Sequence, residues 1–185
     1  NILLIGMDTN QTIMINSEYD KTLKDIAPII KLWYTNPNNI QVLPRINEYK
    51  NNRLLNEINT LIKKLKVEKE YPLSFQNRLK KTQSKYEISK TIGDFKMICI
   101  AASIFIKVDE ESNSTYYTKI LDEINKGINE LKNNKSLELI NISYDSLLIY
   151  NQSEIKKAVD YIYLTRVVPI YQLIKPPSPP PKLRY

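Results

Sequence analysis

Residues 17–33 read SEYDKTLKDIAPIIKLW and decide how the first half of the chain is expected to fold. Ser17-Glu18-Tyr19-Asp20 is a typical helix-start cluster, because short polar side chains accept hydrogen bonds from the free N–H groups of a first turn. Apolar residues then recur at helical spacing, at Leu23, Ile26, Ile29, Ile30 and Trp33. Pro28 interrupts this pattern and predicts either a kink or a later helix start. The stretch therefore predicts one amphipathic helix whose apolar face packs on a core.

Short apolar runs before and after this helix predict strands. Residues 2–7 and 12–15 indicate either a strand pair or one strand preceded by an extension. Ile40-Gln41-Val42-Leu43 is a further strand candidate, closed by Pro44. Residues 97–106 are apolar enough to be buried. They could be a strand or a helix, because a short apolar run does not distinguish the two.

Later segments complete the predicted order of elements. Residues 51–69 form the clearest amphipathic helix, with leucine and isoleucine on one face and lysines on the other. A second helix is predicted over 117–132, followed by a strand near 137–142, and Ser153 is expected to cap a last helix. The order strand, helix, strand, basic segment, strand, helix, strand is typical of a ferredoxin-like α+β sandwich, in which helices cover one face of a small sheet. The residues expected to pack on that face are Leu23, Ile26, Ile120, Leu121 and Ile124.

The composition argues against a catalytic protein. The 185 residues include no histidine, one cysteine and three glycines. Histidine is the usual general base and the commonest metal ligand, and glycine lets a backbone wrap a phosphate. We therefore expect no enzyme activity, no catalytic residue, no metal site, no cofactor and no small-molecule substrate. Cys99 lies in an apolar run and is interpreted as a core residue.

Three patterns that could carry chemistry each have a simpler explanation. Asp109, Glu110, Glu111, Asp122 and Glu123 could be a metal cluster, but they lack the alternating ligands and central glycine of a calcium loop. Ser153 and Lys156 have the spacing of some acyl-transfer enzymes without the companion motifs, so a helix cap and a surface lysine are favoured. The tyrosines that could stack on bases are expected to serve packing instead; they are Tyr161, Tyr163 and Tyr171.

The charge distribution favours an acidic macromolecule as the partner. The net charge is +7 and the isoelectric point is about 9.3. The most basic part lies within residues 72–90 and carries Arg78, Lys80, Lys81, Lys85 and Lys90. Such side chains bind phosphate through charge neutralisation and counterion release. The basic bias is compatible with RNA, DNA or an anionic membrane surface. The segment is the predicted phosphate-binding site, and a solvated surface is the alternative.

Residues 175–185 read KPPSPPPKLRY and predict an extended polyproline II tail. Five prolines stiffen this tail, which lowers the entropy lost on docking. We expect it to run over a neighbouring molecule, with Lys182, Arg184 and Tyr185 as partner-binding residues. The alternative is a strap that buries Leu183 and Tyr185 in the chain's own core.

The residue usage indicates AT-rich coding DNA. Isoleucine occurs 27 times and alanine 4 times, lysine 22 times and arginine 5 times. Isoleucine and lysine have AT-rich codons, whereas alanine and arginine have GC-rich ones. Organelle genomes, some viruses and some parasites show this bias. No apolar stretch reaches the length of a membrane span, so no membrane partner is expected.

Three local strings resemble the universal small-subunit ribosomal protein S-ten family. Residues 15–23 resemble the strand that runs into the family's aromatic–Asp–x–x–Leu helix start. Val42-Leu43-Pro44-Arg45 resembles its Leu-Pro segment, and Ser84-Lys85-Tyr86-Glu87-Ile88 resembles its basic, aromatic–Glu–Ile stretch. The likeness covers roughly residues 11–145. It departs from the family where the Arg and His that usually follow Glu-Ile are Ser89 and Thr91.

The resemblance implies a domain layout and a setting. It makes residues 1–10 an N-terminal extension, 11–145 the family-like domain with an insertion at 46–71, 146–174 a helical extension, and 175–185 the tail. Family members sit in the head of the small subunit, where a long loop threads into ribosomal RNA beside proteins S-three, S-nine and S-fourteen. The RNA-facing residues that it implies are Arg45, Lys85 and Lys90; Arg78, Lys80 and Lys81 are added on charge grounds.

The expected function follows from the resemblance together with the composition. It is that of a structural constituent of the small subunit of a mitochondrial ribosome, binding ribosomal RNA and neighbouring ribosomal proteins. The expected location is the mitochondrial matrix, with the gene in the organelle genome. The alternative is a structural component of a virus or phage particle from an AT-rich genome.

Overall fold

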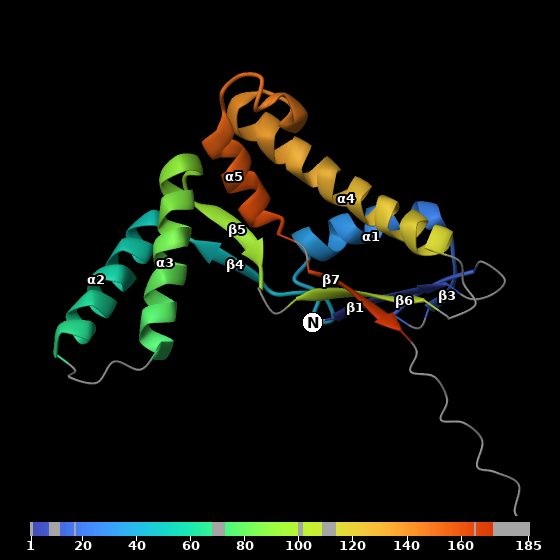
Figure 1. Cartoon of the computed structure of the whole chain (residues 1–185), viewed down its shortest axis with the longest axis horizontal. Coiled ribbons are helices and arrows are strands. Elements are labelled where there is room, and N and C mark those ends of the chain that lie inside the picture. Colours follow the sequence, from blue (N-terminus) through green and yellow to red (C-terminus); the bar gives the residue numbers. More distant parts are fainter. Residues whose placement is uncertain are drawn as a thin grey trace, which may run out of the picture.

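The computed structural model describes seven stretches of the chain, namely residues 2–7, 12–16, 18–67, 73–99, 102–108, 114–164 and 166–171. Figure 1 shows a sheet covered by helices on one side and a helical hairpin projecting beyond its end. The seven strands of these described stretches fall into one sheet of five and one of two.

The main sheet has the strand order β3-β2-β1-β6-β7. Strands β1 and β6 lie at its centre and run parallel, with Leu4 opposite Phe105. β2 and β3 continue the sheet antiparallel beyond β1, whereas β7 is parallel to β6 at the other edge. The bounds are β1 Ile2–Met7, β2 Ile13–Ile15, β3 Glu18–Lys21, β6 Ser103–Val108 and β7 Val167–Tyr171.

Helices α1 (Leu23–Thr35) and α4 (Ser114–Ile140) cover one face of this sheet (Figure 1). Alternate strand residues point toward them and are buried in the main core, which also holds Trp33 of α1 and Ile124 of α4. The residues that the strands of the main sheet contribute to this core are Leu3, Ile5, Met7, Ile13, Ile15, Ile104 and Ile106. Burial of these apolar side chains is the main stabilising contribution to the fold.

The second sheet pairs β4 (Ile46–Tyr49) antiparallel with β5 (Phe95–Ile98). The chain between them forms the hairpin of α2 (Asn51–Val67) and α3 (Leu73–Ile92). Asp94 accepts a hydrogen bond of 2.9 Å from the backbone N–H of Asn51, so the end of the hairpin is tied to its beginning. Phe95 and Met97 then join a small core that connects this sheet to the C-terminal helix.

The C-terminal helix α5 (Ser153–Ile162) is held to α4 by a polar cluster. Asp160 accepts hydrogen bonds from Lys132, at 2.6 Å, and from the hydroxyl of Tyr144 in the short 3-10 helix η1 (Tyr144–Ser146). Burial alone would raise the pKa of Asp160, but the hydrogen bonds from Lys132 and Tyr144 outweigh it and lower the pKa. Burial and the same contact raise the pKa of Tyr144.

The predicted fold class is confirmed: the chain is an α+β sandwich of the ferredoxin-like type, with helices on one face of a small sheet. The parallel central strands and the two helices on one face carry this agreement. Of the residues expected on that face, Ile26, Ile120 and Ile124 are buried and Leu23 packs beside them. Leu121 is only half-buried and lies outside the core.

None of the described helices has the length and apolar character needed to cross a membrane.

Several predicted boundaries differ from the observed ones. Residues 2–7, assigned to an N-terminal extension, are the central strand β1. This strand pairs with β2, so the alternative in which residues 2–7 and 12–15 form a strand pair is the observed one. Residues 18–21 are a strand rather than a helix start. The helix begins at Leu23, where the N–H of Thr22 donates to Asp25 at 2.7 Å in a capping box. That backbone hydrogen bond lowers the pKa of Asp25.

Two predicted strands are not strands. Residues 40–43 form a turn, because the buried amide of Asn36 accepts from the N–H of Ile40 at 2.7 Å and donates to the carbonyl of Pro44 at 3.0 Å. Residues 137–140 continue α4, because Leu139 and Ile140 pack on the side of η1 and α5.

The apolar run 97–106 is neither one strand nor one helix. It ends strand β5 at Ile98 and begins strand β6 at Ser103, so the chain passes from one sheet to the other within the run. Cys99, interpreted as a core residue, lies between the two strands and is only half-buried.

Candidate nucleic-acid interface

The predicted basic segment is helix α3, which packs along α2 (Figure 1). The sequence of residues 72–90 is only weakly periodic, whereas residues 73–92 are helical throughout. α3 buries the small polar residues Thr82 and Ser89, whose hydroxyls donate to the backbone carbonyls of Arg78 and Tyr86. Because these contacts replace an apolar stripe, the sequence of α3 shows weak periodicity although the helix is regular.

Arg78 is committed to a contact inside the hairpin. Its Nη2 and Nε atoms donate to Oε1 of Glu57 on α2, at 2.7 and 2.9 Å. The Arg78 side chain is 63% exposed, so the ion pair stabilises the hairpin by no more than about 1 kcal/mol. Arg78 therefore joins the two helices and is less available for an external phosphate than the sequence suggests.

Lys85 and Lys90 also have partners within the chain. The Nζ of Lys85 donates to the hydroxyl of Tyr49 at 3.0 Å and lies 4.2 Å from the centre of its ring. Lys90 forms an ion pair of 2.5 Å with Glu87, and the hydrogen bond that it donates to Glu87 raises the pKa of the Lys90 ammonium group. Lys85 thus orients a tyrosine, whereas Lys90 is paired with an exposed glutamate.

Lys80, Lys81 and Arg45 are exposed, and no ion pair joins any of them to an acidic residue within the described part of the chain. Lys81 lines a cavity with a volume of about 460 Å³ between the hairpin and β4. Arg45 lines a neighbouring cavity of about 410 Å³. Lys80 lines neither of the two. The structure thus brings Arg45 and Lys81 toward one region and leaves Lys80 apart from it.

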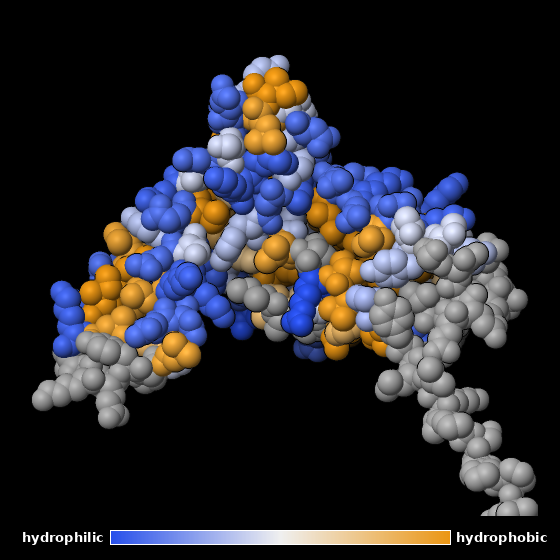
Figure 2. Space-filling model, viewed as in Figure 1, coloured by the Kyte–Doolittle hydropathy of each residue, from blue (hydrophilic) through white to orange (hydrophobic). Residues whose placement is uncertain are grey.

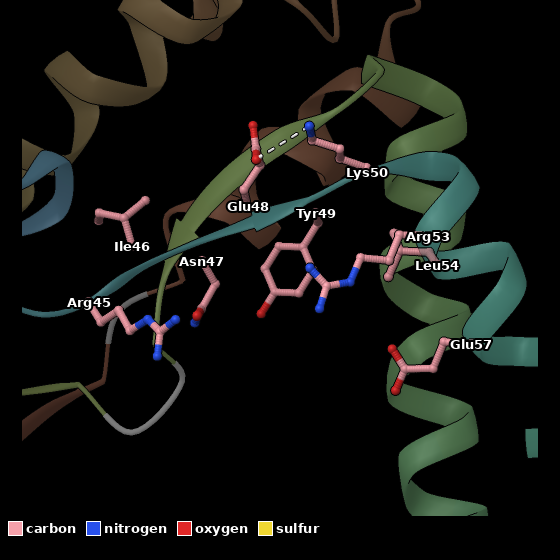
Figure 3. Close-up of a pocket in the computed structure, with 9 residues that line it drawn as sticks. All are labelled: Arg45, Ile46, Asn47, Glu48, Tyr49, Lys50, Arg53, Leu54 and Glu57. Atoms are coloured by element: carbon pink, nitrogen blue, oxygen red, sulfur yellow. Dashed lines mark ion pairs between the residues drawn. The ribbon is translucent and has the colours of Figure 1, made fainter.

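Figure 3 shows how β4 and α2 build the cavity around Arg45. Arg45, Asn47 and Tyr49 are two residues apart, so their side chains project to the same side of the strand. Arg53 reaches toward them from the first turn of α2, and the guanidinium groups of Arg45 and Arg53 point into the cavity from opposite ends. Glu48 points to the other side of the strand and forms an ion pair of 3.7 Å with Lys50.

The two cavities are neighbours that share the lining residues Tyr49, Leu54 and Glu57, and together they are called here the basic groove. Tyr49 is fixed at its centre by stacking on Phe95, with the ring centres 5.2 Å apart. The residues lining the groove are Arg45, Ile46, Asn47, Glu48, Tyr49, Lys50, Arg53, Leu54, Glu57, Ser74, Asn77, Arg78, Lys81, Thr82 and Lys85.

The basic groove carries a net positive charge. Six of its lining residues are lysine or arginine and two are glutamate. Both glutamates, Glu48 and Glu57, are already paired with a basic neighbour. Arg45 and Arg53 form no ion pair among the described residues, and a guanidinium can bind a phosphate group through two parallel hydrogen bonds. The groove can therefore bind a phosphate-bearing ligand.

Other candidate groups have structural roles or lie outside the described residues. Tyr161 and Tyr163 pack around the small core at α5, and burial raises the pKa of both phenols, which confirms the packing interpretation. Within the described stretches, no three acidic, cysteine or histidine residues are grouped to hold a metal ion. Residues 109–113 and the Tyr171 side chain are not described. The predicted partner-binding residues Lys182, Arg184 and Tyr185 are also outside the described part.

Sequence reasoning missed Asn47, Tyr49 and Arg53. The pattern Arg45-x-Asn47-x-Tyr49 is a usable signal, because polar residues at every second position of a strand share one face. Because a strand is expected at 40–43, residues 45–49 fall beyond its end, and their alternation is not interpreted as a strand.

Comparisons with family models, with curated proteins and with solved structures find no match to this chain.

Proposed function

We propose that the chain is an RNA-binding structural protein and not an enzyme, and that the basic groove is its RNA contact. The observation that carries the proposal is the pair of arginines, Arg45 and Arg53, which face each other across Asn47 and Tyr49 without acidic partners among the described residues. An arginine at each end of the cavity around Arg45 suits phosphate groups of one nucleic-acid strand. The amide of Asn47 and the hydroxyl of Tyr49 can add hydrogen bonds to sugar or base.

The finer proposal is a structural constituent of the small subunit of a mitochondrial ribosome. Support comes from the sequence resemblance to the S-ten family and from the AT-rich residue usage. In this setting the α2–α3 hairpin takes the place of the loop that the family inserts into ribosomal RNA. Neighbouring ribosomal proteins would complete the surroundings, and the mitochondrial matrix would be the location.

The RNA contact is tested by the salt dependence of binding. Binding of a single-stranded RNA about 20 nucleotides long is measured between about 50 and 300 mM salt for the chain and for the triple variant Arg45→Gln, Arg53→Gln, Lys81→Gln. Each basic side chain that no longer neutralises a phosphate should lower the slope of log K against log salt by about 0.7. The triple variant should therefore have a slope smaller by about 2 and should bind every RNA sequence more weakly.

The matched control has the same total charge as the groove variant, because it also loses three basic side chains, but these are lysines that lie away from the groove. Lys63, Lys64 and Lys126 are exposed on α2 and α4 and line neither cavity of the groove. Their triple replacement by Gln should leave most of the slope intact. Equal slopes for the two triple variants would show that binding follows overall charge and would overturn the groove as the site. Sedimentation of the chain with the small ribosomal subunit, and not with a virus particle, tests the finer proposal.

A further inference from the structure

The face of the main sheet opposite to α1 and α4 is apolar. Strand residues that alternate with the core residues point to it, and the register places them in rows across the sheet. One row runs Met14, Gly6, Lys107, Ile170, and the next runs Leu4, Phe105, Val168. Ile2 lies beyond them and is 60% exposed. We call these residues the open face.

No described helix lies on the open face (Figure 1). Leu4, Met14, Phe105 and Val168 are half-buried and do not belong to the main core, whereas both sequence neighbours of Leu4, Met14 and Phe105 do. Figure 2 shows apolar side chains at the surface near the end of the main sheet. A sheet face with this many apolar residues is typical of an interaction surface, because exposing it to water is unfavourable.

Lys107 is the charged member of the open face. It stands between Gly6 and Ile170 in its row, and no acidic residue among the described ones forms an ion pair with it. Covering an unpaired ammonium group costs free energy unless the covering molecule supplies a negative charge. An occupant that combines apolar side chains with one well-placed carboxylate therefore suits this face.

These requirements identify the class of partner. We propose that the open face docks an amphipathic segment of a different protein, whose apolar side chains cover the two rows and whose Asp or Glu pairs with Lys107. RNA fits poorly, because a single lysine among apolar side chains offers few phosphate contacts. A second copy of the chain fits poorly, because none of the residues named on the open face is Asp or Glu, so a twofold contact between two such faces would leave both Lys107 ammonium groups without a carboxylate. Residues 172–185 contain no Asp or Glu, so they do not supply the carboxylate side chain.

The proposal goes beyond the RNA contact and does not depend on it, because the open face and the basic groove share no residue. It is tested on the chain in its native assembly with a carbodiimide, which joins a lysine amine to a carboxylate in direct contact with loss of water. We expect Lys107 to be linked to an Asp or Glu of another protein within a peptide that carries several apolar residues. The internal control is Lys31 with Glu130, which are 2.6 Å apart and should be linked in the same sample.

A second measurement covers the case in which no link is found. Acetylation of Lys107 should be at least tenfold slower in the assembly than in the free chain, while exposed Lys126 should react equally in both. Equal reactivity of Lys107 in the two states would overturn the proposal, as would a link to a second copy of the chain or to its own carboxylates. Protection together with an ultraviolet cross-link from Phe105 to RNA would assign the face to RNA and also overturn it.

Discussion

Replacement of Gly127 by alanine tests the packing that fixes the fold. Gly127 is buried on α4 where this helix crosses α1. A Cβ atom at this position would stand 2.8 Å from the carbonyl oxygen of Ala27, 3.1 Å from its Cα and 3.1 Å from the Cβ of Ile30. Two of these atoms are backbone and the third is fixed to it, so none can rotate away. The methyl group must therefore push the two helices apart.

Two opposite effects decide the sign of the change in stability. Alanine favours a helix over glycine by about 1 kcal/mol, which would stabilise α4. Overpacking a well-packed contact costs about 1–3 kcal/mol and more where backbone must move, as it must here. We therefore expect Gly127→Ala to lower the free energy of unfolding by about 1–2 kcal/mol after the propensity gain is included.

The measurement is urea unfolding of the variant and the parent, followed by circular dichroism. The midpoint should fall while the slope m stays unchanged, because the folded chain keeps its buried surface. Asn129→Ala is the matched control, because Asn129 is exposed on the same helix and gains propensity without a clash. If Gly127→Ala raised the midpoint as the control should, α1 and α4 would not cross closely at this residue, and their packing on one sheet face would need revision.

Three further results are expected. Ile124→Ala should lower the free energy of unfolding by about 2–5 kcal/mol, because the Ile124 side chain is fully buried in the main core. Leu121→Ala should lower it much less, because Leu121 is only half-buried. Equal losses for the two variants in urea titrations would contradict the packing of α4. The pKa of Asp160 is lowered on folding, so its stabilising effect should be present above about pH 4 and disappear as the pH falls through its folded pKa. Asp160→Asn should remove this part of the acid sensitivity seen in melting temperatures. Limited proteolysis should remove residues 175–185 first from the isolated chain and leave them intact in its assembly, if the tail lies on a neighbouring molecule.

The fold class could be predicted from the sequence because its signals are long. The pattern Leu23, Ile26, Ile30 specifies one face of a helix over about two turns, and the structure buries two of the three and packs the third against the core. Element ends are less predictable because they depend on single tertiary contacts. Residues 40–43, expected as a strand, form a turn because of Asn36, whose side-chain amide closes the turn from four residues away.

The candidate site was less predictable than the fold, because a basic sequence does not say which charges are free. The local sequence gives no reason to distinguish Arg78 from Lys80, since both are basic residues of the same segment. In the structure Arg78 forms an ion pair with Glu57, 21 positions away across the hairpin, and Lys80 does not. A pairing of this kind depends on how two helices meet and leaves no local pattern. The groove instead depends on Arg53, which lies outside the most basic segment and becomes important because α2 begins beside β4. Charge density along the sequence therefore points to the hairpin that borders the groove, while the backbone geometry determines which arginines can face a phosphate.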